Sequence, residues 1–179
     1  MACQLNSTVA LDCIDSIGGL KGNIYLGTDV DFGTLTFDAN NGITGATGES
    51  GSMYEFQVAK DVANIAETWT ISNTNGTAFF SQALTFNLQK MSAEKRNQLL
   101  LLVRNRNIKF IIQDNNGKYW LGGLTRGAVS TATTAASGTA VGDLNGYTVT
   151  LTAEEPNAMY EVVGEPATVF ADIDFNSVA

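Results

Sequence analysis

The fold is decided by the stretch from Ala63 to Leu88, which reads ANIAETWTIS, then NTNG, then TAFFSQALTFNL. Ile65, Glu67, Trp69 and Ile71 recur at every second position, which is the period of a half-buried β-strand. The abundance of β-branched and aromatic residues favours a strand as well. Asn75-Gly76 is a strong signal for a tight hairpin turn. The stretch therefore predicts two antiparallel strands joined by a turn.

Shorter alternating segments on both sides extend this β pattern, and Asn116-Gly117 predicts a second tight hairpin. The range 42–51 holds four glycines, together with Thr and Ser, so it is predicted as a loop. The order of strands and turns predicts a mainly β fold, an antiparallel sandwich or barrel. The other predicted strands are 23–27, 34–38, 53–58, 107–114, 118–122 and 145–152.

One flanking α-helix is predicted at about 92–105. Ser92 is a suitable N-cap, and Glu94 lies in the first turn, where a carboxylate complements the helix dipole. Leu99, Leu102 and Val103 form the apolar stripe of a helix that packs on a sheet. The basic side chains of this helix are then left to reach solvent or a partner.

The length of 179 residues suits a single domain, 1–179, with long excursions. The range 125–142 is almost wholly Ala, Thr, Ser, Gly and Val. It is either a flexible loop or a hairpin arm that lies across a neighbouring subunit, and the sequence leaves both open. The range 160–179 is either a final strand or a tail that docks on a neighbouring subunit.

The composition argues against catalysis and against bound cofactors. The chain contains no His, which excludes Ser-His-Asp and Cys-His chemistry and every His metal site. Cys3 and Cys13 cannot form a four-thiolate zinc site and are expected to be free thiols. Asp29 and Asp31 lack the third ligand and the glycine of a calcium loop. We therefore expect no enzyme, no cofactor and no metal.

Charge is ordered along the chain. Residues 1–89 sum to −7, residues 90–126 to +6 and residues 127–179 to −7, which gives the net −8. The basic middle is either an ordinary solvated surface or a basic face that meets an acidic face on a copy of the same chain. The second reading predicts a heterologous contact, which closes into rings or continues into tubes. The candidate subunit-interface residues are Lys95, Arg96, Arg104, Arg106, Lys109, Trp120 and Arg126.

Targeting signals are not recognisable. The N-terminal residues have no basic segment followed by a continuous apolar one, and no stretch approaches the ~18 apolar residues of a membrane span. We expect a protein made soluble in a cytoplasm, with no membrane partner. An acidic chain of this kind is a poor general DNA binder but is compatible with a conduit along which DNA slides.

Three stretches resemble virion structural proteins of tailed phages of Bacteroidetes, including the crAss-like group. They are Ala10 to Gly27 (ALDCIDSIGGLKGNIYLG), Phe56 to Lys60 (FQVAK) with the helix after Lys90, and Ile111 to Gly122 (IIQDNNGKYWLG). The resemblance covers about the first 125 residues and implies a tail-tube-like fold whose copies form stacked rings in the tail or neck of the virion. It implies homo-oligomers, a hexamer or dodecamer, with adjacent tail or neck ring proteins as partners. Genomic DNA would pass through the lumen without specific binding.

A different class of function stays open beside this one. A secreted or surface β-sandwich module for adhesion or binding would share the strand pattern, and the missing signal sequence argues against it. An enzyme is the least favoured class, since no nucleophile with a base and no convincing carboxylate pair can be assigned.

Overall fold

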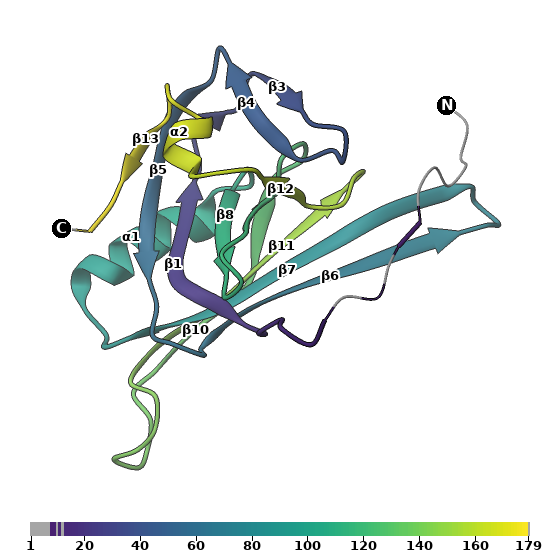
Figure 1. Cartoon of the computed structure of the whole chain (residues 1–179). Coiled ribbons are helices and arrows are strands. Elements are labelled where there is room, and N and C mark those ends of the chain that lie inside the picture. The colour runs from purple at the N-terminus through teal and green to yellow at the C-terminus, as the bar shows by residue number, and fades with distance from the viewer. Residues whose placement is uncertain (1–7, 10, 12, 179) are drawn as a thin grey trace.

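The computed structural model describes residues 8, 9, 11 and 13–178, and its two β-sheets pack face to face (Figure 1). The prediction of a mainly β, largely antiparallel sandwich with one flanking helix is confirmed. Neither sheet closes into a barrel, because among the described residues the strand at each end of a sheet has a neighbour on one side only.

The smaller sheet has four strands in the order β10-β11-β7-β6, all antiparallel. The predicted hairpin 63–88 is confirmed: Trp69 pairs with Phe80, and Gly76 in the turn has φ 63°. The tip of this hairpin projects well beyond the rest of the molecule (Figure 1). The loop between β10 and β11, which form the second hairpin of this sheet, projects the opposite way. The strands are β6 (Ala63–Ser72), β7 (Thr77–Gln89), β10 (Ala128–Ala136) and β11 (Gly146–Glu155).

The larger sheet has nine strands in the order β13-β5-β1-β8-β9-β12-β4-β3, with β2 paired to β5 off this path. The prediction of a loop over 42–51 is wrong, because this range holds β4 and the start of β5. Its glycines act locally: Gly48 and Gly51 adopt φ 74° and 104° where the chain bends. The strands are β1 (Leu20–Gly27), β2 (Val30–Asp31), β3 (Thr34–Phe37), β4 (Ile43–Thr47), β5 (Ser50–Gln57), β8 (Lys109–Asp114), β9 (Tyr119–Gly122), β12 (Tyr160–Val162) and β13 (Asp174–Asn176).

Two hydrophobic clusters lie on the two faces of the larger sheet. The first fills the space between the sheets, where Phe86 and Val149 of the small sheet meet Ile24 and Phe110 of the large one. The second includes Met53 and Ile111 from the opposite face of the large sheet, together with Val169, Phe170 and Ile173. The central strand β8 contributes to both clusters, and its first four residues are all buried. Burial on this scale is the main stabilising term of such a fold.

Helix α1 (Ala93–Arg104) lies along the edge of the sandwich, close to β10. It begins where predicted: the Ser92 hydroxyl accepts a hydrogen bond from the Lys95 backbone N–H at 3.3 Å. Leu99 and Leu102 are buried in the first cluster. The prediction that Val103 joins this stripe is wrong, since 44% of its surface is exposed. A short second helix, α2 (Pro166–Val169), was not predicted.

Both ranges with open sequence interpretations contain regular structure. Within 125–142, strand β10 pairs with β11 along its length, and the connection between them projects as a loop. Within 160–179, β12 pairs with β9 and β4, and β13 pairs with β5 of the same subunit. Two hydrogen bonds between Ile108 and Ala128, at 3.0 and 2.7 Å, tie the two sheets together at one corner.

Candidate assembly surface

Among the described residues, the two outer edges of the four-stranded sheet pair with no further strand, apart from the bridge between Ala128 of β10 and Ile108. Strand β6 has ten residues with Glu67 as its only charge, and β10 has nine residues with none. Neither strand contains Lys, Arg or Pro, the residues with which natural sheets discourage pairing with another chain. A bulge between Ser130 and Ala132 is the single irregularity along β10. Both edges are therefore suited to accept a further strand.

The outer face of this sheet, directed away from the nine-stranded sheet, is small, polar and nearly uncharged. Hydroxyl pairs cross it between strands, Thr85 with Thr150 at 3.2 Å and Thr131 with Thr152 at 3.0 Å. Glu154 carries the only charge among the strand residues of this face, and Arg106 and Arg126 border it at one end. The register places the following residues on this face: Asn64, Ala66, Thr68, Thr70, Ser72, Thr77, Phe79, Ser81, Ala83, Thr85, Asn87, Gln89, Val129, Thr131, Ala132, Thr134, Ala136, Gly146, Thr148, Thr150, Thr152 and Glu154.

A buried carboxylate fixes the loop at one end of this face. Glu155 is 3% exposed and accepts backbone N–H bonds from Thr125 at 3.1 Å, Arg126 at 2.8 Å and Gly127 at 3.1 Å. Three bonds to one carboxylate hold the loop in a single conformation. Arg126 thereby lines a cavity of about 390 Å³ together with Arg106 and residues of β10 and β11.

Four of the seven predicted interface residues lie on the surface. Arg96 and Arg104 are exposed on α1, and Arg106 and Arg126 are exposed beside the same cavity. Lys95 is half-buried, and its ammonium group donates to the Gln89 carbonyl at 2.6 Å. The structure thus brings the four exposed arginines to α1 and to the adjoining corner of the four-stranded sheet.

The other two predicted interface residues point inward. Lys109 is 9% exposed, and its ammonium donates to the Val30 carbonyl at 2.7 Å and lies 5.5 Å from the centre of the Phe32 ring. Burial lowers the pKa of Lys109, opposed by the nearby carboxylates of Asp31 and Glu155. Trp120 is half-buried against the first hydrophobic cluster. Lys109 therefore does not belong to the basic surface of the subunit.

Helix α1 carries apolar side chains that nothing in the described part of the chain covers. Leu100 is 46% exposed, Leu101 63% and Val103 44%. The run of five apolar residues from 99 to 103 exceeds what one face of a helix can bury, so the sequence contained a signal for this surface. The threonines of β10 were missed more completely, because a strand of small residues resembles a linker in composition.

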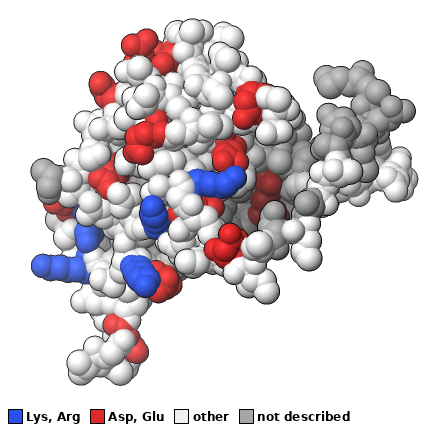
Figure 2. All heavy atoms as spheres, viewed as in Figure 1, with Lys and Arg blue, Asp and Glu red and all other residues white. Residues whose placement is uncertain are grey.

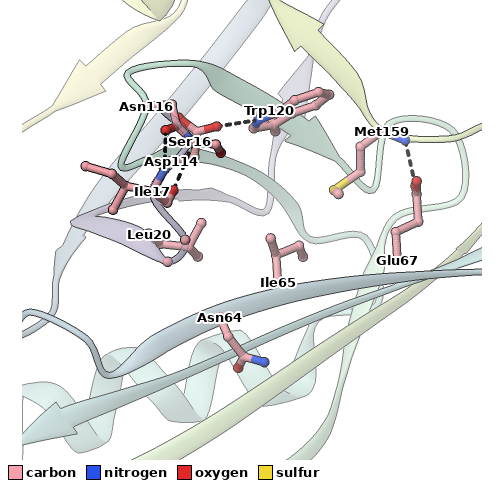
Figure 3. Close-up of a pocket in the computed structure, with 12 residues that line it drawn as sticks. Ser16, Ile17, Leu20, Asn64, Ile65, Glu67, Asp114, Asn116, Trp120 and Met159 are labelled. Carbon is pink, nitrogen blue, oxygen red and sulfur yellow. Dashed lines mark hydrogen bonds between the residues drawn. The ribbon is translucent and has the colours of Figure 1, made fainter. Parts of the chain in front are cut away.

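A second cavity, of about 470 Å³, lies between β6, the β8–β9 turn and the segment before β1 (Figure 3). Ile17, Leu20, Ile65, Trp120 and Met159 give it apolar walls. Glu67 accepts the Met159 backbone N–H at 2.7 Å, as well as the side-chain N–H groups of Trp69 at 3.0 Å and Gln82 at 3.3 Å. Across the described ranges, His, Cys, Asp and Glu form no group of three or more that could hold a metal ion.

Charge of both signs is visible on the surface in Figure 2. Lys and Arg lie across the middle and lower left of this face, while Asp and Glu lie above, between and below them. One ion pair is formed among the described residues, Lys118 with Glu161 at 3.0 Å. The charge blocks of the sequence are thus partly mixed by folding, and most basic groups remain without a carboxylate partner within the described part of the subunit.

Comparison of the chain with models of known families, with curated proteins and with solved structures gave no match. Among the described residues, no helix is long and apolar enough to cross a membrane.

Proposed function

We propose that this chain is a non-enzymatic structural subunit of a phage virion. Its copies form a ring in the tail or neck that surrounds the passage for genomic DNA. The observation that carries the proposal is the four-stranded sheet, which combines two unprotected edges with a nearly uncharged outer face. The resemblance to phage virion proteins supports the same assignment.

The strand directions make this sheet suitable for ring closure. The order β10-β11-β7-β6 contains three antiparallel steps, so β10 and β6 run in opposite directions. Rotation about an axis roughly parallel to the strands places β6 of one copy beside β10 of the next, and that new pair is antiparallel too. The edges contact each other head to tail, which is the kind of contact that closes into a ring. The result is one continuous antiparallel sheet around the channel.

The dimensions favour six copies around a single DNA duplex. Six sheets of four strands give 24 strands. With about 4.8 Å between strands, this cylinder is about 37 Å across, measured between backbones and before strand tilt widens it. Twelve copies would give about 73 Å at the same spacing. The smaller ring admits a duplex with little space left over, and the larger one suits a wider collar or neck.

The chemistry of the outer face suits a passage. Each contact between a basic side chain and a phosphate adds affinity for DNA, so a conduit should present few of them. The strands of the outer face offer mainly threonine, serine, alanine and asparagine, with Glu154 as their only charge. Two basic residues, Arg106 and Arg126, border the face at one end. DNA can therefore slide along it without being held.

The exposed arginines belong to contacts between proteins in this proposal. Arg96, Arg104, Arg106 and Arg126 lie on α1 and the adjoining corner, from which they can meet acidic surfaces of the next subunit or of an adjacent ring protein. Such contacts guide association more than they add affinity. High salt should weaken them, because the Debye length falls from about 10 Å at 0.1 M to about 3 Å at 1 M.

Light scattering coupled to size-exclusion chromatography tests the proposal. We expect the purified chain at high concentration to elute as a closed oligomer, and a strict monomer that also fails to join phage particles would refute it. The double variant Arg104→Glu/Arg106→Glu should assemble less well at low salt. Lys21→Glu/Lys60→Glu changes the net charge equally at two exposed lysines outside the basic region and serves as the control. If both variants assembled equally well, the proposed electrostatic contact of the exposed arginines would be refuted.

A further inference from the structure

Two apolar surfaces lie uncovered at opposite edges of the four-stranded sheet. The α1 surface consists of Leu100, Leu101 and Val103, which are 44–63% exposed. The β6 surface consists of Trp69 and Ile71, which are 65% and 70% exposed on the projecting part of the β6–β7 hairpin. Large exposed apolar groups that lie close together mark sites of association.

Both surfaces lie on the same side of that sheet. Trp69 pairs with Phe80 and Ile71 with Ala78, which are in phase with the buried positions Leu84 and Phe86 of β7. The Trp69 and Phe80 rings touch edge to face, with centroids 5.4 Å apart. Helix α1 packs on this side too, since Leu99 and Leu102 join the cluster that lies between the sheets.

The two surfaces also lie beside different edges. The β6 surface is on one edge strand, and α1 lies next to β10, which is the other edge strand. Within one subunit the strands β7 and β11 separate the two edges, so the α1 surface and the β6 surface cannot contact each other. In a ring where β6 of one copy adjoins β10 of the next, α1 of the second copy lies on the same side of the sheet as the β6 surface of the first. Trp69 is level with Glu155, beyond the Ala128 end of β10, so the two edge strands must also be offset along their length to bring α1 level with the β6 surface.

We propose that the α1 surface of one copy packs against the β6 surface of its neighbour, so that each edge-to-edge junction is supported by a second, apolar contact. The inference rests on the proposed ring and names the occupant of both surfaces as a second copy of this chain. Arg96 and Arg104 are exposed on α1, and β6 carries no basic residue that would repel them. The described residues before β1 do not cover the β6 surface, since Val9, Leu11 and Ile14 are 97–108% exposed themselves.

Disulfide trapping tests this contact. In a background with Cys3 and Cys13 changed to Ser, Ile71→Cys is combined in turn with Leu100→Cys, Leu101→Cys and Val103→Cys. Mild oxidation of assembled protein should give a covalent ladder on a non-reducing gel, from dimers up to the full ring, with at least one pair. The matched control is Ile71→Cys with Val141→Cys, because Val141 is 108% exposed but lies in the β10–β11 loop at the far end of the sheet.

The outcomes separate the two proposals. A ladder with an α1 cysteine and none with Val141→Cys supports the contact. Rings seen by electron microscopy without a ladder for any α1 pair overturn the contact and leave the ring intact. Failure of the unmodified chain to form any ring refutes the proposed function and this contact with it.

A pair of substitutions that introduces opposite charges on the two surfaces gives a second measurement. Leu101→Asp should leave the monomer folded, because Leu101 is 63% exposed. It should raise the concentration needed for half-assembly by about tenfold or more, which is typical of a central interface residue. Adding Ile71→Lys should recover part of that loss, and no effect of Leu101→Asp would overturn the inference.

Discussion

Replacing the buried Glu155 by Gln should destabilise the subunit strongly, although the change adds no bulk. The carboxylate accepts three backbone N–H groups, two on Oε1 and one on Oε2. Gln retains Oε1 as an uncharged acceptor and turns an NH₂ group towards the third N–H. A bond to a charged group contributes about 1.5–3 kcal/mol, and an unsatisfied buried donor costs about 1–3 kcal/mol. We expect a net loss of about 2–4 kcal/mol.

The assay is thermal unfolding followed by circular dichroism at one protein concentration. For a chain of this length, each 1 kcal/mol shifts Tm by about 2–4 °C, so Glu155→Gln should lower Tm by about 4–16 °C. Glu154→Gln is the matched control, since Glu154 is exposed on the outer face and should change stability by less than about 0.5 kcal/mol. The reasoning is refuted if Glu155→Gln unfolds with wild-type Tm, or if both variants lose equal stability.

Three further changes test the helix cap, a buried cation and an open edge. Ser92→Ala removes the hydroxyl that caps α1 and should cost about 1 kcal/mol in urea unfolding, with Ser92→Thr close to wild type. Burial holds the pKa of Lys109 below 10.5, so the unfolded chain binds this proton more tightly. Stability relative to Lys109→Met should therefore rise with pH towards 10.5, and a fall would contradict the sign. The variants Thr133→Pro and Thr134→Pro probe β10, because proline removes the backbone N–H of the residue it replaces. The N–H groups of adjacent residues in a strand point to opposite sides, one towards β11 and the other towards the open edge. The variant that loses the N–H on the open edge should keep monomer stability yet lose rings. Rings in both variants would exclude pairing through this edge.

Much of the fold could be predicted because its signals are local. The hairpin from Ala63 to Leu88 combines period-two alternation with an Asn-Gly turn, and the structure has both strands in that register. The cap at Ser92 and the helix it begins follow from short-range hydrogen bonding in the same way. Such features need no knowledge of the rest of the molecule.

The missed features depend on tertiary context. Strand β4 was hidden by its glycines, and only burial of Ile43 under the second cluster explains why it pairs. Lys109 was assigned to the surface because a basic residue on a predicted strand is usually solvated. It lies instead on a central strand that is buried on both faces, where the Val30 carbonyl accepts a hydrogen bond from its ammonium group. The exposed apolar surface of α1 depends on how much of the apolar face of the helix the sheet covers. The spacing of apolar residues in the sequence does not specify that width.

The candidate surface was foreseen in part. The exposed arginines follow from the charge order of the sequence, because charged side chains without a buried partner remain in solvent. The outer face of the four-stranded sheet could not be foreseen, since the range 125–142 was equally compatible with a linker. Pairing of Thr150 with Ala132 and of Thr85 with Thr150 is what turns these threonines into one surface.

Electron cryomicroscopy of the purified chain, at a concentration where light scattering reports an oligomer, tests the central claim most directly. The account predicts a closed ring whose innermost layer is the four-stranded sheet, with β6 of each copy beside β10 of the next and the threonine-rich outer face directed to the lumen. A ring lined by the nine-stranded sheet would contradict it, and so would a chain that stays monomeric at every concentration.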